Sequence, residues 1–74
     1  MDLENNSEMR IIPNPATDFI HISGIESSEI VSIYSIEGIK VLEGTNNERI
    51  DVSSLSKGIY IIKVQNKYMK FIKI

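Results

Sequence analysis

Hydrophobic residues recur at every second position along much of this chain, in short runs that end at Gly, Asn, Asp or Ser. β-Branched residues, isoleucine above all, dominate these runs, which is typical of strands that bury one face. Every window with helical spacing is interrupted by a glycine or a β-branched run, so no long helix is expected. The pattern predicts an all-β fold, an antiparallel β-sandwich of about seven short strands, over residues 9–12, 18–23, 30–36, 39–42, 49–52, 59–65 and 68–74.

In each of the last two predicted strands, neither face is polar for its full length. In the strand over 59–65, Tyr60, Ile62 and Val64 share one face, and this strand is expected to be central in its sheet. The strand over 68–74 mixes core positions with exposed lysines. Its two faces carry Tyr68, Lys70, Ile72 and Ile74 on one side and Met69, Phe71 and Lys73 on the other.

Proline, glycine and asparagine mark the expected turns. Two prolines fix the backbone in the sequence over 13–16, where the chain must leave one strand and change direction. Gly38 is expected at positive φ in a tight hairpin, and Asn66 in the left-handed region of a second hairpin. Residues 43–48 form a longer polar loop in this interpretation.

A single apolar residue stands in the polar segment over 53–58. We expect Leu55 to plug the open end of the sandwich. Asp51 or Ser53 could cap one helical turn there, and Gly58 would end it before the next strand.

The length and charge pattern indicate a single domain. Seventy-four residues without cysteine form at most one core, and no disulfide or thiolate metal site supports it. Residues 1–10 are acidic and polar, so we interpret them as a linker or a segment added for expression, and residues 11–74 as the folded domain. All ten acidic residues precede position 52, whereas the last 23 residues hold five lysines and no acid. The net charge of −2 does not favour nucleic acid as a partner.

The residues that enzymes and metal sites need are missing from the sequence. His21 is the only histidine, and it stands between two isoleucines of a predicted strand without the nucleophile and acid of a recognisable triad motif, so we interpret it as a structural strand residue. There is no clustered set of metal ligands, and the four glycines are too scattered to cradle a phosphate. The chain is also too small to enclose a substrate pocket beside its core. No catalytic activity, cofactor, metal or small-molecule substrate is therefore expected.

Three motifs, in this order and spacing, resemble the C-terminal sorting domains of the type IX secretion system of Bacteroidetes. In that family an Asn-Pro-Ala turn opens the domain, a Gly-x-Tyr precedes a late strand, and a lysine-containing strand closes it. The matching positions here are Asn14-Pro15-Ala16, Gly58-Ile59-Tyr60 and Lys70-Phe71-Ile72-Lys73-Ile74. The resemblance covers residues 11–74 and implies an immunoglobulin-like sandwich.

The resemblance also implies a function. Such a domain follows an N-terminal passenger, is recognised in the periplasm, and guides the passenger through the outer-membrane translocon to the cell surface or the medium. A sortase-like protease then often removes it.

Two groups of residues are candidates for these roles. The basic final strand is the candidate for partner recognition, either by strand addition or by packing, with its lysines setting the orientation; the residues are Lys67, Tyr68, Lys70, Phe71, Lys73 and Ile74. The same lysines could instead only discourage aggregation of an exposed strand. The family-motif residues have sufficient backbone explanations and are interpreted as mainly structural: Pro13, Asn14, Pro15, Ala16, Gly38, Leu55, Gly58 and Tyr60.

Two other kinds of function stay open on the sequence alone. One is a carbohydrate-binding or adhesive module, against which the absence of tryptophan counts. The other is an inert spacer domain of a surface protein. An exposed last strand would also permit a strand-swapped homodimer.

Overall fold

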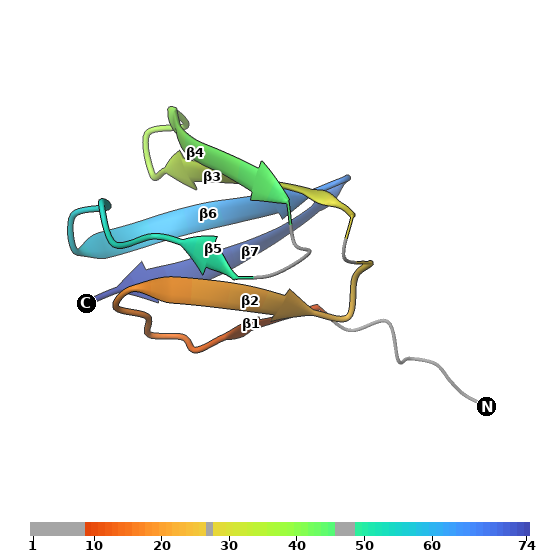
Figure 1. Cartoon of the computed structure of the whole chain (residues 1–74). Coiled ribbons are helices and arrows are strands. Elements are labelled where there is room, and N and C mark those ends of the chain that lie inside the picture. Colours follow the sequence, from red (N-terminus) through yellow and green to blue (C-terminus); the bar gives the residue numbers. More distant parts are fainter. Residues whose placement is uncertain (1–8, 27, 46–48) are drawn as a thin grey trace.

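The protein is a sandwich of seven strands with no helix among the residues described by the structure, a computed structural model that covers residues 9–26, 28–45 and 49–74 (Figure 1). This confirms the all-β prediction. The strands are β1 (Arg10–Ile12), β2 (Phe19–Ser23), β3 (Ile30–Ser35), β4 (Lys40–Thr45), β5 (Ile50–Asp51), β6 (Gly58–Val64) and β7 (Lys67–Lys73). Within these ranges no helix could cross a membrane.

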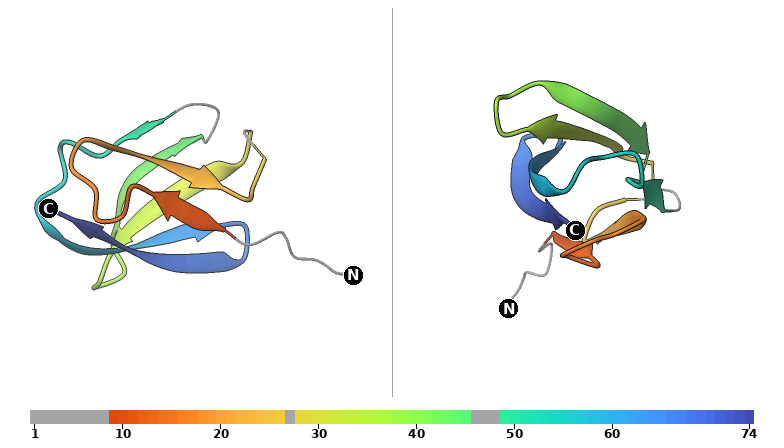
Figure 2. Two further views of the ribbon diagram at one scale, coloured as in Figure 1. Left: turned by 90° about the horizontal axis from the view of Figure 1, so that it is seen from below. Right: turned by 90° about the vertical axis from the view of Figure 1, so that its left-hand side faces the viewer.

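Two antiparallel sheets face each other across the core (Figures 1 and 2). One sheet has three strands in the order β1-β2-β5, and the other has four in the order β4-β3-β6-β7. In the four-stranded sheet, β6 lies between β3 and β7, which confirms the central position predicted because neither of its faces is polar for its full length. The closing strand β7 is therefore at an edge.

The core is made by alternate residues of both sheets, because successive side chains of a strand point to opposite faces. The face of β6 that carries Tyr60, Ile62 and Val64 is the inward one: Ile62 and Val64 are buried and Tyr60 packs against the core. The largest fully buried side chains are Phe71, Ile20, Ile22, Ile33, Ile62, Val31, Val52 and Val64.

The prediction of a polar loop over 43–48 is wrong at its beginning. Strand β4 continues through Glu43 and Gly44 to Thr45, because these residues pair with Ser32, Val31 and Ile30 of β3. Backbone pairing with a long neighbouring strand outweighs the low strand propensity of these side chains. Positions 46–48 lie outside the described residues.

The two hairpin predictions had different outcomes. Gly38 has φ of +89°, as predicted, and its N–H donates to the carbonyl of Ser35 at 2.9 Å. In the β6–β7 hairpin, however, the left-handed residue is Gln65, with φ of +56°, and not Asn66. The reason is the register: Val64 pairs with Lys67, so Gln65 is the first of two loop residues, and tight hairpin loops need positive φ at that position.

The segment after β5 forms a hydrogen-bonded turn and not the predicted helical turn. The N–H of Leu55 donates to the carbonyl of Val52 at 3.0 Å. Asp51 Oδ1 accepts hydrogen bonds from the N–H and the hydroxyl of Ser53, at 2.9 and 2.6 Å. Leu55 is half-buried and packs against the core, which agrees with its predicted place.

The folded part begins earlier than residue 11. Met9 is buried in the core and Arg10 opens β1, which pairs with β2 from Arg10↔Ser23 to Ile12↔His21. Of the stretch interpreted as a linker, residues 1–8 lie outside the described residues.

Candidate partner-recognition site

The closing strand β7 is held by a complete ladder on one side. Every residue from Lys67 to Lys73 pairs with β6, from Val64↔Lys67 to Gly58↔Lys73. This ladder fixes which side chains point into the core and which point outward. It therefore decides which of the predicted recognition residues a partner can reach.

The six predicted recognition residues fall into two groups. Lys67, Tyr68, Lys70 and Ile74 are exposed, and Tyr68 has 63% of its surface accessible. Phe71 is fully buried and Lys73 is 9% exposed. A partner can touch the first group in the folded domain, whereas the second group lies on the core side of the strand.

Phe71 joins the core through an aromatic contact. Its ring centroid lies 5.7 Å from that of Tyr60, at an interplanar angle of 30°. The apolar part of the Lys73 side chain is buried against the core. Its ammonium group donates a hydrogen bond to the carbonyl of Ile74 at 3.3 Å, so the charge reaches the surface. These two residues hold the strand in place.

Residues 14–16, which we call the clasp, cover part of the outer edge of β7. The N–H of Ile72 donates to Asn14 Oδ1 at 2.9 Å, and the N–H of Ala16 donates to the carbonyl of Ile72 at 2.8 Å. The N–H of Ile74 then donates to the carbonyl of Ala16 at 2.9 Å. The Asn-Pro-Ala motif thus serves as a short extra strand along the end of β7, a role the sequence did not reveal.

Ala16 is the part of the clasp that enters the core. It is 1% exposed and forms a parallel bridge with Lys73, while Pro13 and Pro15 are exposed. A larger side chain would have to displace core atoms at this position. The motif therefore combines an edge-covering backbone with a small buried anchor.

The other half of the same edge is open. The N–H and C=O groups of Ile72 and the N–H of Ile74 point toward the clasp. In an antiparallel strand the direction of these groups repeats every second residue, so the N–H and C=O groups of Tyr68 and Lys70 point to the same outer edge. Along this half of the edge, the clasp supplies only a 3.5 Å contact from Asn14 Nδ2 to the carbonyl of Lys70. Among the described residues, no backbone group pairs with the outer edge at Tyr68.

The side of the four-stranded sheet that points away from the core, which we call the outer face, is both apolar and basic. Its residues form rows that run across the paired strands. One row consists of Lys40, Tyr34, Ile61 and Lys70, and the neighbouring row on the same face consists of Glu43, Ser32, Lys63 and Tyr68. Ile59 and Ile72 form a third row and are 47% and 38% exposed.

A shallow hollow lies in the outer face. It has a volume of about 360 Å³, and its wall is largely apolar. The residues that line it come from three strands and the β3–β4 turn: Tyr34, Ser35, Ile36, Gly38, Ile61, Lys63 and Tyr68. Sequence analysis identified only Tyr68 and Gly38 of this set, because the hollow depends on the register between strands.

Two further motif residues, Gly58 and Tyr60, lie at the start of β6. The hydroxyl of Tyr60 donates to the carbonyl of Ser56 at 2.6 Å and ties β6 to the preceding turn. Gly58 has φ of +154°, a conformation that residues with side chains rarely adopt. That Gly58-Ile59-Tyr60 is mainly structural stays a prediction.

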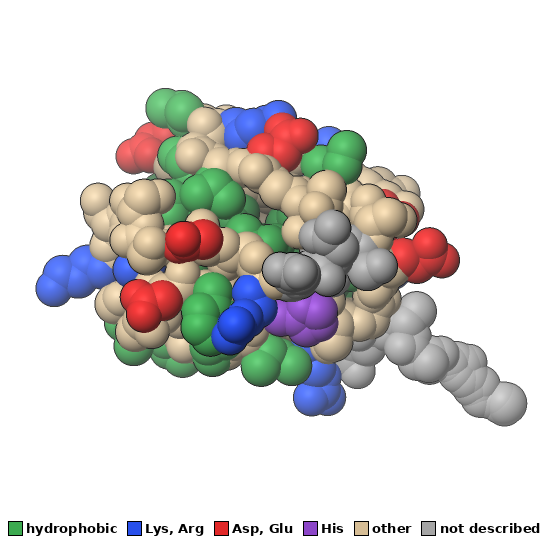
Figure 3. All heavy atoms as spheres, in the orientation of Figure 1, with side chains coloured by type: hydrophobic (Ala, Val, Ile, Leu, Met, Phe, Trp, Pro, Cys, Tyr) green, Lys and Arg blue, Asp and Glu red, His purple; other side chains and the backbone are tan. Residues whose placement is uncertain are grey.

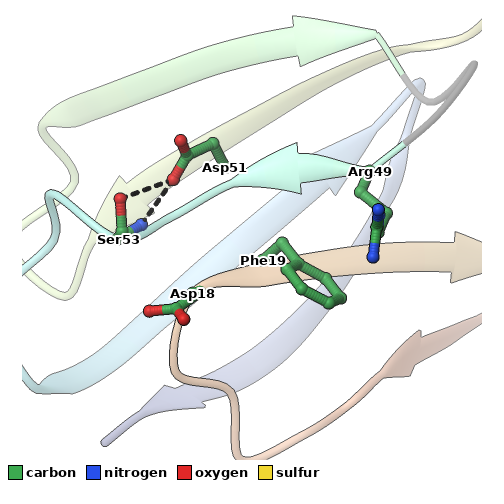
Figure 4. Close-up of a pocket in the computed structure, with 5 residues that line it drawn as sticks. All are labelled: Asp18, Phe19, Arg49, Asp51 and Ser53. Carbon is green, nitrogen blue, oxygen red and sulfur yellow. Dashed lines mark hydrogen bonds between the residues drawn. The ribbon is translucent and has the colours of Figure 1, made fainter.

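A second hollow, of about 350 Å³, lies beside β2 and β5 (Figure 4). The guanidinium of Arg49 stacks over the ring of Phe19 at 4.3 Å, and the hydrogen bonds from Ser53 lower the pKa of Asp51 below its ordinary value. Arg49 and Asp51 thus each have a partner within the lining of this hollow. In the described part of the chain no three His, Cys, Asp or Glu side chains gather to hold a metal ion, and His21 is exposed on β2 (Figure 3).

Comparison with known proteins gave two matches. The family model described as the secretion system C-terminal sorting domain matches residues 10–74. β-Agarase D of Zobellia galactanivorans is 36% identical over 58 residues, which make up 77% of this chain and 12% of the agarase. The chain therefore spans a small part of that relative's length. No solved structure matches the chain.

Proposed function

We propose, from the premise that this chain belongs to the family of secretion system C-terminal sorting domains, that the exposed half of β7 is what the secretion machinery recognises. The domain is a sorting signal for type IX secretion, and it directs the export of the larger passenger protein to which it is joined. Sorting and not catalysis is the role of this family.

One observation carries this proposal: β7 presents lysines and free backbone groups at the same half of its edge. Lys67 and Lys70 are exposed, and no carboxylate of the described residues pairs with either. An open strand edge binds an extended partner through its backbone, and unpaired charges beside it favour one orientation and a fast encounter. Phe71 and Lys73 contribute by keeping the strand in its sheet.

The proposed route follows from this recognition. The domain meets the outer-membrane translocon from the periplasm, the passenger crosses, and a sortase-like component acts at the surface. No cofactor, nucleic acid or small-molecule substrate takes part. Two copies of the domain could also exchange β7, because the strand would then form the same β6–β7 ladder between chains. A dimer detected by light scattering would support such a strand-swapped homodimer.

The test is the export of a reporter that carries this domain in a host with type IX secretion. Reversing both charges with Lys67→Glu and Lys70→Glu leaves the core and the clasp unchanged. We expect the exported fraction of the reporter to fall about tenfold, which corresponds to about 1.4 kcal/mol of lost binding. Deleting all of β7 is a poorer test, because it also removes Phe71 from the core.

Lys57→Glu is the matched control, because Lys57 is exposed in the turn before β6 and away from the open edge. It should leave export unchanged. Thermal unfolding of each purified domain shows whether the fold is kept. Full export of a folded Lys67→Glu, Lys70→Glu variant would refute the recognition of β7.

A further inference from the structure

The outer face has more apolar surface than a solvated sheet face needs. The exposed side of an antiparallel sheet usually carries polar residues, so that the pattern alternates. Here the outward positions of β6 and β7 include Ile59, Ile61, Tyr68 and Ile72, and Tyr34 continues the patch onto β3. A contiguous apolar patch with a polar rim is typical of a surface that binds another protein.

The charges on the outer face are almost all of one sign. Lys63 and Lys70 flank the apolar residues. The one carboxylate in these rows, Glu43, is 2.7 Å from the ammonium of Lys40, and this pairing raises the pKa of Lys40 above its ordinary value. Among the described residues, no other ion pair neutralises this face. A complementary partner therefore carries negative charge.

From this combination we propose that the outer face is a docking site for an acidic protein segment that inserts an apolar side chain into the hollow beside Tyr34, Ile61 and Tyr68. The apolar side chain gains burial against the aromatic and isoleucine side chains. Carboxylates on either side of it reach Lys63 and Lys70. The inference rests on the proposed function, since it extends the recognition surface from the edge of β7 across β6 to β3.

The positive charge of the outer face favours an acidic protein segment over a second copy of this domain or a glycan. A second copy of this domain would bring two lysine-rich faces together, which like-charge repulsion disfavours. A glycan would gain from the tyrosines but not from the lysines. An acidic segment uses both features of the surface.

A purified domain tests the chemistry of the site directly. The probes are the capped pentapeptide Glu-Glu-Phe-Glu-Glu and its basic counterpart Lys-Lys-Phe-Lys-Lys, added at millimolar concentration to isotope-labelled domain. We expect amide chemical shifts to change along β3, β6 and β7 with the acidic peptide alone. Raising the salt from about 0.05 to about 0.5 M should weaken this binding, because it shortens the Debye length severalfold.

Equal shifts with both peptides, shifts confined to the other sheet, or no shifts would each overturn the proposal. Binding of neutral oligosaccharides at the hollow without binding of the acidic peptide would also overturn it, in favour of a glycan.

Export separates this inference from the recognition of β7. The variant Tyr34→Ser, Lys63→Glu changes only β3 and β6, so it leaves the edge of β7 as it is. We expect its exported fraction to fall about tenfold, as lost binding of about 1.4 kcal/mol would give. Ile12→Ser, Lys57→Glu is the control with the same types of substitution away from the outer face, and it should be exported normally.

The outcomes of this experiment are distinguishable. If the unaltered domain fails to export the reporter, the proposed function is wrong. If the unaltered domain works and a folded Tyr34→Ser, Lys63→Glu variant works equally well, only the docking role of the outer face is wrong. Unfolding measurements establish that each variant is folded, and Tyr34→Phe with Lys63→Gln provides a milder pair if the first variant is not.

Discussion

Tyr60 fixes the position at which β6 begins. Its ring contacts Phe71 within the core, and its hydroxyl reaches back to the carbonyl of Ser56 at 2.6 Å. A tyrosine that is half-buried needs a partner for its hydroxyl, and the turn before β6 supplies one. The Gly-x-Tyr spacing places the glycine at the strand's first residue and the tyrosine two residues on, facing the core.

Replacing Tyr60 by Phe should remove this hydrogen bond and keep the ring. We expect the free energy of unfolding to fall by about 0.5 to 1.5 kcal/mol, the usual net contribution of one hydrogen bond. Denaturant unfolding measures it. Tyr68→Phe is the control, because Tyr68 is 63% exposed and its hydroxyl reaches water, so its stability should stay within about 0.5 kcal/mol. Equal effects of the two substitutions would contradict this role of Tyr60.

Among the elements, β7 depends on two partners that are far apart in the sequence. The β6 ladder is local and was predicted from the hairpin. The clasp joins Asn14 to Ile72, 58 residues away, and a lone asparagine between prolines gives no sign of such a contact. The strands themselves could be predicted within a residue or two, because alternation records burial directly. The end of β4 and the left-handed Gln65 could not, since pairing and register determine them.

The candidate site was predictable to a similar extent. Alternation already placed Phe71 and Lys73 on the face opposite Tyr68 and Lys70, and the structure buries the first pair and exposes the second. Tyr34, Ile61 and Lys63 were not recognised as part of one surface. Their proximity comes from the register of β3, β6 and β7, which the sequence of each strand alone does not contain.

The clasp predicts an uneven pattern of amide hydrogen exchange along β7. The N–H groups of Ile72 and Ile74 should exchange slowly because they are hydrogen-bonded, whereas that of Tyr68 should exchange fast. Asn14→Ala should speed exchange at Ile72 and lower the free energy of unfolding by about 0.5 to 1.5 kcal/mol. Asn66→Ala, in the exposed β6–β7 turn, serves as the control. Slow exchange at Ile72 in the Asn14→Ala variant would argue against the clasp.

At the scale of the whole molecule, folding gathers the basic residues of the C-terminal part of the sequence on one sheet. The lysine-rich, acid-free last 23 residues become mainly β6 and β7, which are adjacent strands of one sheet. Their lysines thereby meet the apolar residues of the outer face. The recognition we propose depends on this arrangement and not on the order of residues in the tail alone.

The most direct test of that claim is the export of a reporter that carries the domain with Phe71→Ala. Loss of a fully buried phenylalanine costs about 3 to 5 kcal/mol, which is close to the total stability of about 5 kcal/mol at the lower end of the range for folded domains. The variant should therefore unfold, although Lys67, Tyr68, Lys70 and Ile74 are all retained. We predict that its exported fraction, relative to the total reporter made, drops to the level of a reporter without the domain, while Ile12→Ala is exported normally. Normal export of a Phe71→Ala domain shown by circular dichroism to be unfolded would contradict the account.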